Sequence, residues 1–228
     1  MNGVILKRLR GVGVLAILFL SVPAFGQNLS RLVSEHNVLK AREWEYKKKV
    51  SYESVVGIPY YTNDYVKCVV YAHSRDSITL DLRFDLFINE MEYRQNEILM
   101  WLDKEQIKGL KYGAEKVTVA EIAGETDPAY LFVVEDGPYS LLLRKSVAFR
   151  DTEPPRAYTD PLPQRFEPED DVYYIKNGNF PAQPVMSKKQ LDDIVVGKPG
   201  AVEFVKKQKT KPAKEKDLIK LVQFLNML

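Results

Sequence analysis

The sequence is poor in the residues from which disulfide frameworks and metal centres are built. Its 228 residues include one cysteine and two histidines. One cysteine excludes an intramolecular disulfide and a cysteine-based zinc or iron–sulfur site, and two histidines leave few ligands for any other metal. The chain has no nucleophile elbow, His-Glu-x-x-His helix, phosphate-binding loop or calcium loop. We therefore predict neither a metal nor a cofactor.

Long apolar runs are also scarce, and the clearest one lies at the start of the chain. It follows a positive region formed by Lys7, Arg8 and Arg10. Residues 11–22 are apolar, which is shorter than the roughly 20 residues that a membrane-spanning helix needs. Ala24 and Gly26 are small residues at the positions that a signal peptidase requires. We predict a cleaved signal peptide over residues 1–26, with an uncleaved anchor as the alternative.

This prediction implies a cellular location for the rest of the chain. It is expected to be exported, periplasmic or secreted, and to have no transmembrane anchor after cleavage. Gln27 stands where a lipoprotein would carry its lipidated cysteine, so we do not expect a lipoprotein.

A strong excess of one charge is missing, but the charge is unevenly placed. The chain has 33 Lys and Arg against 31 Asp and Glu, a net charge of +2. The signal peptide holds three of the basic residues and no acid, so the rest of the chain has a net charge of −1. Residues 187–228 carry ten Lys against five acids, whereas residues 27–186 carry 20 basic and 26 acidic residues. The two parts either dock or are both solvated, with an anionic-lipid or nucleic-acid patch as the alternative. For an exported chain we predict no nucleic-acid partner.

What the chain does contain is the two-residue periodicity of β-strands. In residues 77–88 the even-numbered residues are apolar and the odd-numbered ones up to Asp85 are polar, which is typical of a sheet with one wet face. The apolar residues then change phase, so residues 88–90 are predicted to hold a tight turn or a β-bulge. Asp136-Gly137 predicts a hairpin with a type I′ turn. Further strands are expected at residues 98–102, 107–112, 117–122, 130–135, 138–149 and 172–176.

Composition divides the exported chain into three parts. Residues 27–65 form a lead-in helix or arm and a turn-rich aromatic segment. Residues 66–186 form a β-meander body, including a proline-rich acidic loop over residues 151–171 that we expect to be irregular. Residues 187–228 form a basic helical segment packed on the body. The apolar face of its last helix must be covered, either by the sheet or by a partner or membrane surface.

These patterns predict a mainly β fold. Consecutive strands joined by short turns make an antiparallel β-meander, and the strand–helix–strand alternation of a parallel sheet is missing. We expect eight or nine strands curled into a barrel or half-barrel. Two or three C-terminal α-helices should accompany the sheet.

Several motifs resemble a set of exported bacterial β-meander proteins of unassigned function. The longest is Leu-Arg-Phe-Asp-Leu-Phe-Ile-Asn-Glu-Met-Glu-Tyr at residues 82–93. The others are Gly-Ile-Pro-Tyr at 57–60, Gly-x-Tyr-x-Leu-Leu at 137–142, Tyr-Tyr at 173–174 and the helix with its closing Asn at 217–226. The resemblance implies an exported β-meander protein and brings no catalytic residues with it.

Four carboxylates near the clearest strand are candidate catalytic residues: Asp81, Asp85, Glu90 and Glu92. Residues two apart on one strand face are about 6.6 Å apart, and paired carboxylates at such separations can hydrolyse glycosidic bonds. The alternative, which we favour, is a solvated Asp–Arg–Asp ladder around Arg83 that contributes less than about 1 kcal/mol per pair.

Tyrosines supply candidate ligand-binding residues. The chain has 13 Tyr, and five of them fall between residues 52 and 71. Tyrosine can stack on sugars or line an apolar pocket, although it is also an ordinary half-buried strand residue. The ligand-binding candidates are Tyr60, Tyr61, Tyr65, Tyr71 and Arg83.

The remaining nucleophile candidate is weak. Cys68 and His73 would have to act as thiol and base, but five residues apart on a strand they fall on opposite faces. We expect Cys68 to be a buried structural residue. The sequence as a whole predicts a non-catalytic binding or envelope-interaction protein, whose partner is an unknown envelope protein or a small ligand. A glycosidase-like hydrolase and an assembly subunit docking through its C-terminal helix are the alternatives.

Overall fold

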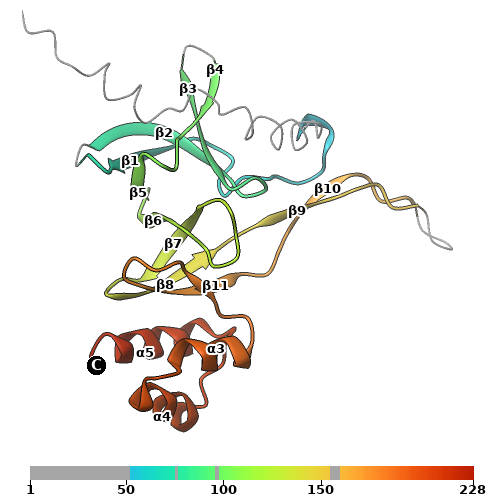
Figure 1. Ribbon diagram of the computed structural model, residues 1–228. Coiled ribbons are helices and arrows are strands. Elements are labelled where there is room, and N and C mark those ends of the chain that lie inside the picture. Colours follow the sequence, from blue (N-terminus) through green and yellow to red (C-terminus); the bar gives the residue numbers. More distant parts are fainter. Residues whose placement is uncertain (1–51, 75–76, 96–97, 155–159) are drawn as a thin grey trace, which may run out of the picture.

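The described structure is built around one long antiparallel sheet. The computed structural model describes residues 52–74, 77–95, 98–154 and 160–228, so the predicted signal peptide and most of the lead-in segment lie outside the described residues. Ten strands form the sheet in the order β12-β11-β8-β7-β6-β5-β1-β2-β3-β4 (Figure 1). Their bounds are β1 (Val66–Ala72), β2 (Ser77–Asp85), β3 (Glu90–Gln95), β4 (Ile98–Trp101), β5 (Ile107–Tyr112), β6 (Glu115–Ala120), β7 (Ala129–Glu135), β8 (Tyr139–Arg144), β11 (Val172–Asn177) and β12 (Gln183–Pro184).

A two-stranded ribbon and three helices complete the described fold. The ribbon pairs β9 (Val147–Arg150) with β10 (Arg165–Pro168) and projects to one side of the sheet in Figure 1. A short 3-10 turn, η1 (Tyr52–Ser54), precedes β1. The helices α3 (Lys188–Val195), α4 (Pro199–Gln208) and α5 (Glu215–Leu225) follow β12. The predicted class, a mainly β antiparallel meander with C-terminal helices, is confirmed.

The sheet is open, with β12 and β4 at its two edges. Of the two predicted shapes, the closed barrel is therefore wrong. The expected number of eight or nine strands is also too low, because β10 and β12 are short and were not recognised, and because the single strand expected at residues 138–149 is divided into β8 and β9. β10 lies inside the proline-rich loop that was expected to be irregular, and Pro168 ends it opposite Val147. A two-stranded ribbon has a free edge on each strand, where the missing N–H of proline is tolerated.

The polar–apolar alternation of β2 is confirmed along most of its length. Leu82 and Phe84 are buried, whereas Thr79 and Asp81 are exposed. The buried face packs into the main core. The opposite face, called the outer face below, is wet at Asp81 but becomes covered towards the end of the strand, where Asp85 is 1% exposed.

The β2–β3 turn curls the sheet onto itself. Residues 86–89 form the predicted tight turn, and Asn89 closes it with a φ of 54°. The Asn89 side chain accepts the Tyr130 N–H at 2.8 Å and donates to the Tyr130 carbonyl at 3.1 Å. Phe84 also lies edge-on to the Tyr130 ring, with centroids 5.9 Å apart. Since Tyr130 is on β7, four places away in the strand order, these contacts draw the two halves of the sheet together.

The β7–β8 connection is a hairpin, but its turn is not the predicted type I′. That turn needs positive φ at both central residues, and Gly137 has one (156°) whereas Asp136 does not. The side chain of Asn226, just past α5, lies beside this turn. Asn226 accepts the Tyr139 N–H at 2.7 Å and donates to the Tyr139 carbonyl at 2.9 Å. A Cβ atom at Gly137 would lie 2.5 Å from Asn226 Nδ2, so a larger residue there would displace the Asn226 side chain.

The apolar face of α5 is covered by the protein's own sheet. Its buried residues are Leu218, Leu221, Val222 and Leu225. α5 contacts β7 and β8, and α4 contacts both α5 and α3. The rings of Phe204 and Phe224 stack at 4.5 Å between α4 and α5. No helix in the described part of the chain has the length and apolarity that a bilayer crossing requires.

Candidate functional site

A buried ion pair joins β2 to β3 on the outer face. Arg83 and Glu92 are register partners. Arg83 Nε donates to Glu92 Oε1 at 2.6 Å, and Arg83 Nη2 lies 2.5 Å from the same oxygen. The Glu92 side chain is 3% exposed and that of Arg83 is 18% exposed. Burial lowers the pKa of Arg83, but the hydrogen bond and negative charge of Glu92 outweigh it and raise the pKa overall. The guanidinium is therefore both charged and fixed in place.

Two tyrosines hold this guanidinium between their rings. Arg83 Cζ lies 3.6 Å from the centroid of the Tyr60 ring and 4.9 Å from that of Tyr65. The Tyr65 hydroxyl donates to Glu92 Oε1 at 3.2 Å. Both tyrosines remain partly exposed. A cation and two phenol rings are thus presented together at the surface, an arrangement that desolvated cation–π contacts stabilise.

The segment that carries Tyr60 is held from both sides. The Leu86 N–H donates to the Pro59 carbonyl at 2.8 Å, which fastens the segment to the β2–β3 turn. The Phe166 N–H donates to the Val56 carbonyl at 2.8 Å, which fastens it to β10. Gly57 has a φ of 88°, and a Cβ atom there would meet the Phe166 carbonyl oxygen at 2.8 Å. The Gly-Ile-Pro-Tyr motif therefore places Tyr60 over Arg83.

Asp85 is a second buried carboxylate on the outer face. Its Oδ1 accepts the N–H groups of Phe87 at 2.9 Å and Ile88 at 3.2 Å, and its Oδ2 accepts the Tyr52 hydroxyl at 2.9 Å. Burial raises the pKa of Asp85 to about 6. Burial, followed by the charge of Asp85, also raises the pKa of Tyr52, which stays a hydrogen-bond donor. With three donors on its oxygens, Asp85 organises the β2–β3 turn.

The other two candidate carboxylates lie apart from this arrangement. Asp81 is exposed on β2, opposite Lys67. Glu90 is the register partner of Asp85, but its carboxylate accepts Lys104 Nζ at 2.9 Å. A general acid or nucleophile must reach its substrate, and the two carboxylates that are buried side by side on this face, Asp85 and Glu92, are 1% and 2% exposed. The geometry is that of hydrogen-bonded structural groups.

Two of the candidate tyrosines lie away from Arg83. The Tyr61 ring packs against Phe132 with centroids 4.8 Å apart, and its hydroxyl donates to the Glu115 carboxylate at 2.9 Å. Tyr71 is 46% exposed near the far end of β1. It is separated from Tyr65, which precedes β1, by six residues, or about 20 Å of extended chain. The structure therefore brings together three of the five ligand-binding candidates, namely Tyr60, Tyr65 and Arg83.

Cys68 is a core residue. It is 1% exposed, and its thiol donates to the Val66 carbonyl at 3.1 Å. Burial raises the pKa of the Cys68 thiol to about 11, so the nucleophilic thiolate is scarce at neutral pH. His73 lies exposed beyond the end of β1. Within the described ranges, no three His, Cys, Asp or Glu residues are placed to share a metal ion.

The aromatic group that packs against Tyr60 was not predicted from the sequence. The Tyr52 ring lies edge-on to Tyr60 at 6.0 Å, to Phe87 at 6.2 Å and to Phe166 at 5.1 Å. Phe149 of β9 adds a contact with Phe166 at 5.9 Å. This group ties the β9–β10 ribbon to the β2–β3 turn. Its members are far apart in the chain, so no local pattern could have revealed it.

Comparison with known proteins yields no relative for this chain. No protein-family model, curated protein or solved structure matches it. The functional argument therefore rests on the geometry. Two of the motifs that suggested an exported family meet at the site: residues 57–60 supply Tyr60, and residues 82–93 supply both Arg83 and Glu92.

Proposed function

We propose that the protein is an exported, non-catalytic binding protein, and that its contact surface is the Arg83 cluster, defined as Tyr60, Tyr65, Arg83 and Glu92. The observation that carries the proposal is the guanidinium held between two tyrosine rings with a buried carboxylate behind it. Tyrosine and arginine dominate binding hot spots, because they offer large contact areas at a low cost in conformational entropy when they are held rigid.

The chemistry of the cluster defines the kind of ligand that fits it. The partly exposed phenol rings offer apolar faces for stacking, and the guanidinium offers donors to carbonyl, hydroxyl or carboxylate oxygens. An envelope protein or a small ligand with an apolar face and adjacent acceptors would satisfy both. The predicted signal peptide supports a partner outside the cytoplasm.

Two alternatives are less well supported. A hydrolase would need accessible carboxylates, whereas Asp85 and Glu92 are buried and each accepts several hydrogen bonds. An assembly subunit docking through the apolar face of its last helix would need that face free, whereas Leu218, Leu221 and Val222 are fully buried within the protein.

Capture from the source cell's envelope fraction tests the proposal. The bait is the chain from Gln27 onward, and the retained partner or ligand is quantified for the wild type, for Tyr65→Ala and for Tyr71→Ala. Tyr71 is the matched control, because it is an exposed tyrosine near the far end of β1, whereas Tyr65 directly precedes that strand. Truncating a hot-spot tyrosine should weaken binding about tenfold or more. Equal retention by the two variants would contradict the proposal.

A further inference from the structure

The helical tail carries a concentrated positive charge, here called the lysine corner. It covers the last turn of α4, the turn that follows and the N-cap of α5. Residues 206–214 contain five lysines and no acid. All five are exposed: Lys206, Lys207, Lys209, Lys211 and Lys214. Among the ion pairs of the described residues, the pair that involves one of them joins Lys214 to Asp217 at 3.7 Å.

The acidic sheet body does not neutralise this charge. The tail docks on the sheet through the apolar residues of α5, whereas the five lysines are exposed to solvent. In Figure 1, α4 is the helix that lies farthest from the sheet. The lysine corner is therefore an outlying part of the molecule with its charge available to another surface.

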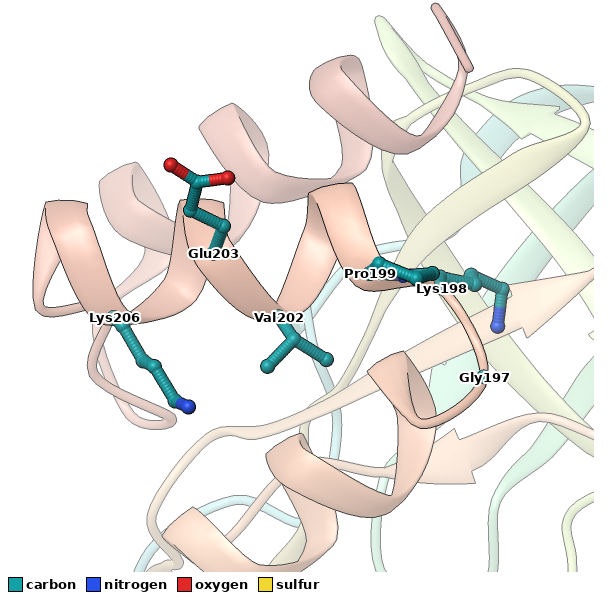
Figure 2. A pocket seen from close by; sticks show the side chains of 6 residues that line it. All are labelled: Gly197, Lys198, Pro199, Val202, Glu203 and Lys206. Carbon is teal, nitrogen blue, oxygen red and sulfur yellow. The ribbon is translucent and has the colours of Figure 1, made fainter.

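An open groove along α4 and the turn that precedes it continues from the lysine corner. Its volume is about 400 Å³, and its lining residues are Gly197, Lys198, Pro199, Val202, Glu203 and Lys206. Figure 2 shows the Val202 and Lys206 side chains on the same side of α4, while Glu203 points the other way. Lys206 belongs to both features. The groove thus has an apolar floor around Val202 and a positively charged rim at Lys206.

The basic residues of the helical tail are all lysines, and this indicates which kind of partner the lysine corner can bind. Residues 187–228 contain ten lysines and no arginine. On the sheet, by contrast, arginines make defined pairs, such as Arg144 with Glu125 at 2.8 Å and Arg165 with Glu153 at 2.6 Å. Arginine's planar fork suits a carboxylate in a fixed position, whereas lysine is a flexible point charge without a preferred geometry. Lysines alone suit a surface of many mobile negative charges.

We propose that the lysine corner and the adjoining groove dock the protein on an anionic lipid surface. The lysines neutralise phosphate headgroups, and the apolar floor around Val202 accepts the less polar part of a lipid beneath its headgroup. Each lysine near such a surface strengthens binding roughly fivefold. This surface lies on a different part of the molecule from the Arg83 cluster, so the two proposals stand or fall independently.

Vesicle co-sedimentation tests the proposal with the chain from Gln27 onward. The probes are vesicles of equimolar phosphatidylcholine and phosphatidylglycerol, and vesicles of phosphatidylcholine alone. Binding to the first and not to the second is expected, and raised salt should weaken it by screening. The triple variant Lys206→Gln, Lys207→Gln and Lys211→Gln should bind about 100-fold more weakly.

A second triple variant provides the matched control. Lys67→Gln, Lys108→Gln and Lys111→Gln remove the same charge from exposed positions on β1 and β5, and this variant should keep wild-type binding. Equal weakening by both triple variants would overturn the proposal, because net charge alone would then explain the binding. Absence of binding to the anionic vesicles at low salt would also overturn it. In the competing case the lysine corner binds a second copy of the chain. Light scattering without vesicles would then give the mass of a dimer, and the protein would not bind the vesicles.

Discussion

The charges on the outer face of β2 and β3 and those on the helical tail are arranged in opposite ways. Arg83, Asp85 and Glu92 are largely buried, and each is held by side-chain hydrogen bonds. The lysines of the lysine corner are exposed, and they lie on a helix end and a turn. On the outer face the paired charges fix side chains in position. In the lysine corner the exposed charges have the same sign and together create a region of positive electrostatic potential.

This difference has a consequence for substitutions. Removing one member of a buried ion pair leaves the other charge without a partner in a poorly solvated place. Removing one exposed lysine leaves nothing unpaired. Single substitutions of the charged residues on the outer face should therefore destabilise the protein. In the tail, only substitutions on the buried apolar face should do so.

The largest effect is expected from Arg83→Met. The substitution leaves the Glu92 carboxylate buried without its cation, which should lower the free energy of unfolding by about 3–5 kcal/mol. Urea denaturation of the variant and the wild type measures the difference. Arg150→Met is the matched control, because Arg150 is 50% exposed in a surface pair with Glu167, and such pairs contribute less than about 1 kcal/mol. Equal losses from the two substitutions would remove the distinction between the regions.

Within the tail, Leu221→Ala should destabilise the protein while its neighbour Lys220→Ala should not. Leu221 is fully buried on the apolar face of α5, and truncating a buried leucine lowers the free energy of unfolding by about 2–5 kcal/mol. Lys220 is exposed, and surface substitutions usually stay within about 0.5 kcal/mol. Thermal and urea unfolding of both variants would show the contrast. A destabilised Lys220→Ala protein would mean that the tail lysines do structural work.

The pH dependence of stability should distinguish Asp85 from ordinary surface carboxylates. Its folded-state pKa of about 6 lies above its ordinary value of 3.8, so the folded state holds the proton more tightly than the unfolded state. The stability from this group is therefore complete below pH 3.8 and is lost as the pH rises through 6. The free-energy difference between the wild type and Asp85→Asn should shift by up to about 3 kcal/mol across this window. A difference that does not change with pH would contradict the burial argument.

The smallest effect concerns the closing asparagine. Asn226→Ala removes two hydrogen bonds to the backbone of Tyr139 and leaves its partly buried N–H and C=O groups without these partners. The expected loss is about 1–2 kcal/mol in the free energy of unfolding. Hydrogen exchange at the Tyr139 amide should accelerate along with it. An unchanged exchange rate would show that the contact does not hold α5 on the β7–β8 hairpin.

Local structure was largely predictable from the sequence, because strand periodicity is a local property. The alternation in residues 77–85 matches β2, and the phase change after residue 88 matches a real turn. Whether the curled sheet closes into a barrel was not predictable, since the curl depends on contacts such as Asn89 with Tyr130, which are 41 residues apart. The predicted type I′ turn was wrong, and its surroundings were equally hidden in the sequence, because Asn226, whose side chain lies beside Gly137, is 89 positions along the chain.

The candidate site was predictable in its members but not in its roles. Residue types pointed to Tyr60, Tyr65 and Arg83, and the structure brings these three together. Glu92 stood out as a possible catalytic acid, whereas the strand register makes it the partner of Arg83. Register between two strands is fixed by the turn that joins them and by the faces they bury, and it cannot be read from either strand alone.

Site-specific photo-crosslinking in the native envelope tests the central claim most directly. A photo-reactive phenylalanine analogue replaces Tyr65, just before β1, in one variant and Tyr71, near the far end of β1, in another, so that both probes are accessible to solvent. If the Arg83 cluster is the contact surface, the probe at position 65 should give a discrete crosslinked product. The probe at position 71 should give no product of that mass. The same product from both positions, or a product from position 71 alone, would contradict it.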